Sequence, residues 1–161
     1  MRQVLAISIA LMTLAAFPVK AGTPTAVFGF ELYDTSGEVG GAGHDTRLAM
    51  AGALLRDRLA ASARFDVVPL DAYRAEIAAL GYLDGCNGCE LAVARQAGAR
   101  WSVRGLVHKV STLILYLQIT VTDARSGAVM QTATAGIRGD NDRAWRRGIR
   151  YLVEHELTAP R

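Results

Sequence analysis

The chain has few of the residues and motifs that catalysis usually needs. Its 161 residues include two cysteines and three histidines, and no Ser/His/Asp set or nucleophile elbow has recognisable spacing. A glycine-rich stretch at 35–43 precedes a helical pattern, but it lacks the Gly-Lys-Ser/Thr ending that holds phosphate and magnesium. We therefore expect no enzyme, no cofactor and no bound metal.

Long apolar runs are missing except at the N-terminus. Arg2 precedes an uncharged run at 4–17, and the small residues that signal peptidase reads end at Ala21. The run is shorter than the roughly 20 residues of a spanning helix, so we expect export and cleavage after Ala21 rather than anchoring. No cysteine stands directly after that site, where a lipoprotein carries its lipid, and this argues against a lipoprotein. The expected location is the periplasm, with no stable membrane insertion after cleavage.

Lysine is also scarce. Beyond Ala21 the chain holds one lysine, Lys109, and its other cations are arginines. Removal of residues 1–21 takes away two cations and no acid, so the formal charge falls from +3 to +1. The balance gives no reason to expect a nucleic-acid partner. The 140 residues that remain are enough for one domain, 22–161, with a single core.

The residues after Ser111 alternate strictly between the two faces of a strand. The apolar set is Leu113, Leu115, Leu117, Ile119 and Val121. Period-two alternation predicts a half-buried strand. A turn at 123–127, with Asp at its start and Gly at its end, returns the chain as a hairpin toward 129–137. Together with a strand over 101–110, these patterns predict a meander of three antiparallel strands.

The remaining elements follow from short patterns. A first strand at 26–32 places Phe28, Phe30 and Leu32 on one face, and Asp45 or Thr46 can cap the next helix. A short strand at 65–68 follows, and then two helices, one capped by Asp71 and ending at Gly81 and one from Glu90 to Gly98. The last helix starts at the capping residues Asp140-Asn141-Asp142. The order β-α-β-α-α-β-β-β-α predicts an α+β domain with a mixed sheet of about five strands and helices mainly on one face.

The two cysteines, Cys86 and Cys89, allow three interpretations. In an exported protein a close pair favours a structural disulfide. The pair can instead be redox-active, because Cys89 lies near a helix start that lowers a thiol pKa. The third interpretation is a tetrahedral metal site, with two of His44, His108 and His155 completing the ligands.

Several short motifs carry a resemblance to known envelope proteins. They are Gln96-Ala97-Gly98-Ala99-Arg100 before Val103-Arg104-Gly105, Thr122-Asp123-Ala124-Arg125-Ser126-Gly127, Cys86-Asn87-Gly88-Cys89-Glu90, and Ile137-Arg138-Gly139 before Trp145. The chain resembles the α/β domain shared by the amino-terminal part of TolB, the curli-secretion lipoprotein CsgG and the penicillin-binding-protein activator LpoB. Within that group it is most similar to a family of small proteobacterial periplasmic proteins of unknown function. The resemblance implies recognition or assembly, and it carries over no active site.

Three surfaces are candidates for contact with an envelope protein partner. They are the glycine loop with Gly40 and Gly41, the cysteine loop 84–90 with Glu90, and the arginines of the last helix, Arg143, Arg146, Arg147 and Arg150. An arginine face of this kind fits an acidic partner or lipid headgroups, but it is also common as a merely solvated face. The expected function is a non-catalytic periplasmic accessory protein. The alternative is a thiol-disulfide or metal-handling accessory that uses Cys86 and Cys89.

Overall fold

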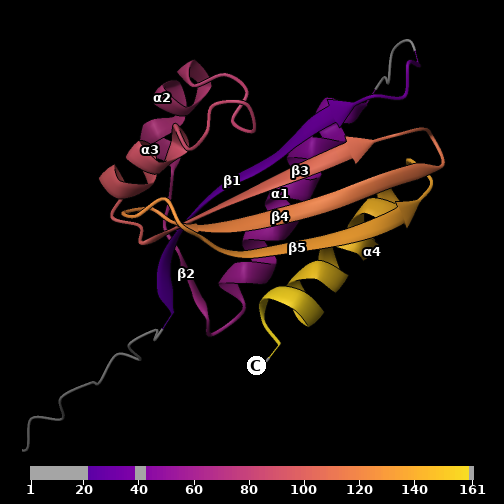
Figure 1. Ribbon diagram of the computed structural model, residues 1–161. Helices are drawn as coiled ribbons and strands as arrows, with labels where there is room; N and C mark the ends of the chain where they lie inside the picture. Colours follow the sequence, from indigo (N-terminus) through magenta and orange to yellow (C-terminus); the bar gives the residue numbers. More distant parts are fainter. Residues whose placement is uncertain (1–21, 39–42, 160–161) are drawn as a thin grey trace, which may run out of the picture.

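The computed structural model describes residues 22–38 and 43–159 (Figure 1). The expected signal segment with its cleavage site after Ala21, and the loop residues Gly40 and Gly41, lie outside the described residues. In chain order the elements are β1 (Thr23–Asp34), α1 (His44–Ala60), β2 (Phe65–Val67), the 3₁₀ turn η1 (Asp71–Tyr73), α2 (Arg74–Ala79), α3 (Glu90–Gln96), β3 (Trp101–Lys109), β4 (Ile114–Asp123), β5 (Val129–Arg138), α4 (Asp142–Tyr151) and the π-helical turn η2 (Leu152–Leu157). The expected order of strands and helices is confirmed.

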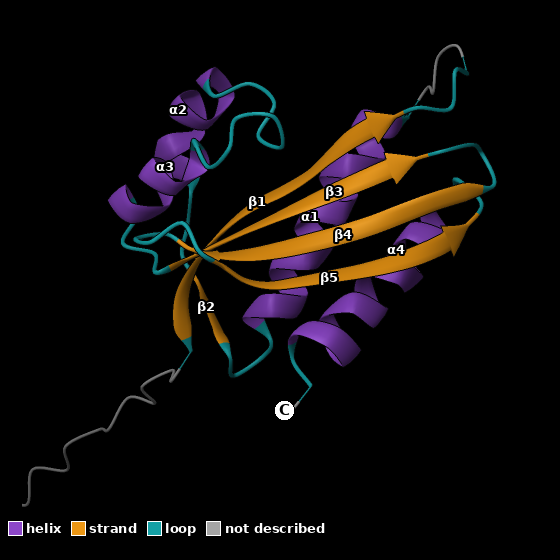
Figure 2. Ribbon diagram, in the orientation of Figure 1, coloured by secondary structure: helices purple, strands orange, loops and turns teal. Residues whose placement is uncertain are grey.

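The strands form one mixed sheet in the order β2-β1-β3-β4-β5. β1 runs parallel to β2 and β3, and β3, β4 and β5 form the expected antiparallel meander. In Figures 1 and 2, α1 and α4 lie behind the sheet, whereas α2 and α3 lie beside the end where β3 begins. No described helix is both long enough and apolar enough to cross a bilayer.

The main core lies between the sheet and the helices α1 and α4. It holds Leu55 and Leu59 of α1, Leu117 and Ile119 of β4, and Trp145 of α4, all fully buried. A smaller cluster of alanines, Ala26, Ala94, Ala99 and Ala124, lies on the opposite side under α3. Each cluster is covered by its own helices: α1 and α4 cover the main core on one face of the sheet, and α3 covers the alanine cluster on the other.

A β-bulge in β1 changes which residues share a face. The register against β3 shifts between Val27 and Gly29, and Gly29 has a φ of 91°, a conformation that glycine adopts readily. Phe28 therefore packs toward the alanine cluster, whereas Phe30 lies in the main core. The expectation that Phe28, Phe30 and Leu32 share one face is wrong, because one extra residue reverses the alternation.

Two of the expected helix caps are replaced by other interactions. Helix α1 begins at His44 after Gly43, without a side-chain cap from Asp45 or Thr46. Asp71 lies inside the 3₁₀ turn and forms an ion pair with Arg74 instead of capping a helix. The cap of α4 is confirmed, because the Asn141 side chain accepts a hydrogen bond from the Ala144 N–H at 3.0 Å.

The Asp140 carboxylate, 9% exposed, joins three elements at one end of the sheet. Its Oδ1 accepts hydrogen bonds from the Arg47 guanidinium at 2.7 Å and from Trp145 Nε1 at 3.1 Å. Its Oδ2 lies 2.8 Å from His44 Nε2 and 3.9 Å from Lys109 Nζ. The start of α1, the end of β3 and the start of α4 are thus held together by one carboxylate.

Lys109 ends β3 with its side chain on the core side, only 3% exposed. Its ammonium group lies 2.9 Å from the Glu38 carboxylate and 3.5 Å from that of Asp34. The contact with Glu38 raises the pKa of Lys109, and the same contact lowers the pKa of Glu38. The pKa of Asp34 is also lowered, mainly by hydrogen bonds from Ser36 and to a smaller extent by Lys109.

A first prediction concerns Gly105, which lies directly opposite Phe30 in the β1–β3 pair. A Cβ added there would overlap the Phe30 ring, so Gly105→Ala should lower the free energy of unfolding by about 1–3 kcal/mol. Gly136→Ala is the matched control, because its Cβ would lie 3.6 Å from Tyr116 at ordinary contact distance. Urea unfolding measures both variants. Equal stability of the two would contradict the packing of Phe30 on Gly105.

A second prediction concerns the pH dependence of the Lys109 contacts. The lowered pKa of Glu38 means that this contact stabilises the fold above the ordinary glutamate pKa of 4.5 and is lost as the pH falls through the lowered value. The raised pKa of Lys109 means that the contact is also lost as the pH rises beyond 10.5. Lys109→Met should therefore destabilise the protein at pH 5–9, and the difference from wild type should shrink below about pH 4. A difference that stays constant down to pH 2 would refute the assignment.

Candidate functional site

The cysteine loop contains a disulfide, and hydrogen bonds from two neighbouring strands, β1 and β3, hold the start of the loop against the sheet. Cys86 and Cys89 are bonded, with their Cα atoms 5.6 Å apart, as the first interpretation of the pair predicts. Glu31 of β1 accepts hydrogen bonds from the backbone N–H groups of Leu83 and Asp84 at 2.7 and 2.9 Å. Arg104 of β3 donates to the Leu83 carbonyl at 2.9 Å. These contacts place the loop firmly on β1 and β3.

Glu90 begins α3 immediately after the disulfide and is only 1% exposed. Its Oε1 lies 3.8 Å from the Arg104 guanidinium, and its Oε2 has no hydrogen-bond partner among the described residues. A buried carboxylate cannot contact a partner, so Glu90 does not belong to an exposed binding surface. The sequence placed it on the surface because its burial depends on how α3 packs against the sheet.

The three histidines do not gather around the cysteines. His44 bonds Asp140, His108 lies on the open sheet face 5.0 Å from the Tyr33 ring, and His155 lies beside Tyr151. Within residues 22–38 and 43–159, the one group with metal-ligand spacing is Cys86, Cys89 and Glu90, whose ligand atoms lie within 4.8 Å of one another. A disulfide offers no thiolate, so the third interpretation of the pair, a metal site with two histidines, is not formed among the described residues.

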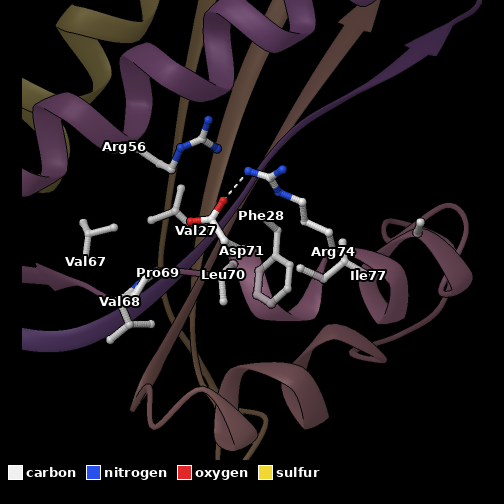
Figure 3. A pocket seen from close by; sticks show the side chains of 11 residues that line it. Val27, Phe28, Arg56, Val67, Val68, Pro69, Leu70, Asp71, Arg74 and Ile77 are labelled. Atoms are coloured by element: carbon white, nitrogen blue, oxygen red, sulfur yellow. Dashed lines mark hydrogen bonds and ion pairs between the residues drawn. The ribbon is translucent and has the colours of Figure 1, made fainter.

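An open hollow lies between α1, β1, β2 and α2 (Figure 3). Its walls are mainly apolar and include Val27, Phe28, Val67, Leu70 and Ile77. Figure 3 shows the carboxylate of Asp71 directed at the guanidinium of Arg74, with which it forms an ion pair, and Arg56 at the other side. Its lining residues include no histidine, cysteine, serine or second carboxylate, so the hollow has no nucleophile or acid–base pair.

The four arginines of α4 lie on its solvent face. Trp145 and Ile149 point into the core, and helical spacing therefore turns Arg143, Arg146, Arg147 and Arg150 outward, where all four are exposed. No carboxylate among the described residues forms an ion pair with any of them. We call this set the arginine face. Of the expected contact surfaces, the arginine face is exposed to solvent in the structure. Gly40 and Gly41 lie outside the described residues.

The arginine face borders a groove that sequence reasoning missed. β5 is the last strand of the sheet, and between it and α4 lies a groove with Ala135, Ile137 and Gly148 at its floor. Arg138, Arg147 and Tyr151 complete its walls. No sequence pattern indicates that β5 is an edge, because strand order depends on pairing between distant segments.

Comparison with known proteins identifies the fold. The structure is similar to the LpoB C-terminal domain from Salmonella enterica, with a TM-score of 0.56 and 18% identity over 74% of this chain and 84% of that one. The same domain from Escherichia coli gives a TM-score of 0.54 and 20% identity over 77% and 88% of the two chains. The resemblance to the LpoB-type envelope domain is thus confirmed at the level of the fold.

A third solved structure matches along more of the chain. The PelC dodecamer from Paraburkholderia phytofirmans gives a TM-score of 0.51 and 16% identity over 89% of this chain and 92% of that one. No curated protein matches the sequence significantly. Residues 23–157 match the model of the family DUF3280, described as a protein of unknown function (DUF2380). The match spans nearly the whole domain, and the chain therefore belongs to the DUF3280 family.

Proposed function

We propose that the chain is an exported accessory protein that binds an acidic surface of another envelope component through its arginine face. The observation that carries this proposal is the set of four exposed arginines on α4 that have no carboxylate partner among the described residues. Surface arginines without partners attract acidic groups and can donate two parallel hydrogen bonds to a carboxylate. In this proposal a second molecule supplies the carboxylates that pair with these arginines.

The apolar N-terminal run and the fold support the same proposal. The run at residues 4–17 is typical of an export signal and supports a location beyond the cytoplasmic membrane, and the fold is similar to that of the LpoB C-terminal domain. The lining of the hollow beside α2 includes no nucleophile and no acid–base pair. This favours a binding role for the protein over a catalytic one. The partner is an envelope protein with an acidic patch.

The thiol-disulfide alternative has less support. The pair forms a disulfide between two partly buried cysteines, and Glu31 and Arg104 hold its loop against the sheet. Reactive pairs need an accessible sulfur with a lowered thiol pKa. The arrangement is therefore better suited to holding α3 in place than to exchanging electrons.

The proposal predicts a charge-dependent loss of binding. Arg143→Glu with Arg147→Glu should abolish capture of the partner from a periplasmic extract, and weaken binding of the purified partner at least tenfold at low salt. Wild-type binding should weaken steeply between 0.05 and 0.5 M salt, because the charges are exposed. Arg125→Glu, on the β4–β5 turn, is the control and should bind as wild type does. Undiminished capture by the double variant would refute the proposal.

A further prediction separates the two roles of the cysteines. Cys86→Ser with Cys89→Ser should lower the free energy of unfolding by about 2 kcal/mol, because the disulfide closes a short ring, and should leave partner capture unchanged. Thiol titration of the native protein should detect no free thiol. A pair that mild reductant opens, together with a mixed disulfide trapped by Cys89→Ser alone, would favour the thiol-disulfide alternative.

A further inference from the structure

β5 is an edge strand that is regular from Gln131 to Arg138, whereas its start is disturbed by a register shift against β4, and Gln131 donates a hydrogen bond to the Glu156 carbonyl of η2. β5 runs for 10 residues without a proline or a lysine, and no described strand pairs with its outer side. An edge of this kind presents a row of unpaired N–H and C=O groups. The opposite edge, β2, has only 3 residues and is soon followed by Pro69. The free pairing capacity of the sheet is thus concentrated at β5.

The groove beside this edge is shaped by the close approach of α4. Gly148 makes the approach possible, because a Cβ there would meet Leu117 and Ile137 at 2.6 and 2.7 Å. The groove is lined there by Ala135, Ile137 and Gly148, and the exposed ring of Tyr151 borders it. Its width is set by one helix and one strand, which suits an extended chain better than a second helix.

The charged residues along the groove are cations. Arg138 and Arg147 line it, and Arg143 lies with both of them in the adjoining hollow. The neighbouring carboxylate, Asp142, accepts a hydrogen bond from Arg47 at 2.9 Å and is thus already engaged. An occupant that brings carboxylates gains charge-assisted hydrogen bonds, whereas an occupant with cations is repelled.

We infer that the outer edge of β5 accepts an extended acidic segment of the partner protein as an added strand. Backbone hydrogen bonds to β5 supply the pairing, and carboxylates of the segment bind Arg138 and Arg147. This inference rests on the proposed function and names the form of the partner at that site. It adds backbone hydrogen bonds between the partner and β5, which binding through the arginine face alone would not need.

A second copy of the chain is a less suitable occupant. Two β5 strands paired antiparallel over their full length would set the Arg138 end of each strand against the Val129 end of the other, so Arg138, Arg143 and Arg147 of the two copies would lie far apart. These arginines have no carboxylate partners within either described chain. The β5 strand of a second copy holds no aspartate or glutamate, so it brings no carboxylate to these arginines, whereas an acidic segment does.

The test uses a fluorescein-labelled ten-residue peptide of alternating valine and glutamate, with fluorescence anisotropy at 0.15 M salt. The first control has lysine in place of glutamate. The second keeps the glutamates but carries N-methyl groups on alternate backbone nitrogens along one edge, so that it cannot donate ladder hydrogen bonds. Two such peptides, one methylated on each edge, cover both orientations. We expect the acidic peptide to bind. The lysine peptide should bind at least tenfold more weakly, and so should one of the two methylated peptides, the one whose methylated edge faces β5, whereas the other methylated peptide should bind as the unmodified one does.

Two variants locate the site. Arg147→Gln should weaken binding of the acidic peptide at least tenfold, whereas Arg146→Gln should change it less than threefold, because Arg146 is also exposed but does not line the groove. Amide chemical shifts should move mainly within β5 when the peptide is added. Unfolding curves confirm that both variants retain the stability of wild type.

Each contrary result overturns the inference. Binding of both methylated peptides within twofold of the unmodified one would show charge attraction without strand addition. Equal effects of Arg146→Gln and Arg147→Gln would place the peptide elsewhere, and a dimer at micromolar concentration that the peptide cannot dissociate would assign the edge to a second copy. If strand addition fails while Arg143→Glu with Arg147→Glu still abolishes partner capture, the proposed function stands without it. If capture is unaffected, the proposed function fails whatever the peptide does.

Discussion

The carboxylate of Asp140, only 9% exposed, is the constraint on which the rest of the structure depends. It joins His44 and Arg47 of α1, Lys109 of β3 and Trp145 of α4, so the two large helices and the sheet meet at one acceptor. A buried charge is stable only when its partners surround it. This requirement fixes where α4 begins and how it rotates, because Trp145 must reach both the carboxylate and the core. The outward direction of the arginine face follows from that rotation.

The same geometry creates the groove at β5. The short Gly139–Asp140–Asn141 connection leads directly from the end of β5 into α4, so strand and helix lie side by side with little between them. Gly148 lets them approach closely and leaves a shallow channel where a larger residue would fill the space. A sheet edge, an apolar floor and a row of cations are thus products of one tight turn and one small residue.

The cysteine loop has a different role in this arrangement. Glu31 and Arg104 hold it against β1 and β3, on the side of the sheet opposite the large helices. Arg104 also lies near Asp84 and Glu90, at 3.3 and 3.8 Å, so one guanidinium balances the acids of the loop. The disulfide and the ion pairs therefore stabilise the smaller layer, at a distance from the surface proposed to bind.

Patterns that are local in the sequence determined much of this protein. Alternation along 113–121, the turn at 123–127 and the caps before α4 led to the right order of elements, and the spacing of Cys86 and Cys89 led to the disulfide. The helical period of α4 also indicated an exposed arginine face. Only the tertiary structure decided that Glu90 is buried, that Phe28 and Phe30 face opposite ways and that β5 is a free edge. The reason is physical: periodicity reports which residues share a face of one element, whereas burial, bulges and strand order depend on contacts between segments far apart in the chain.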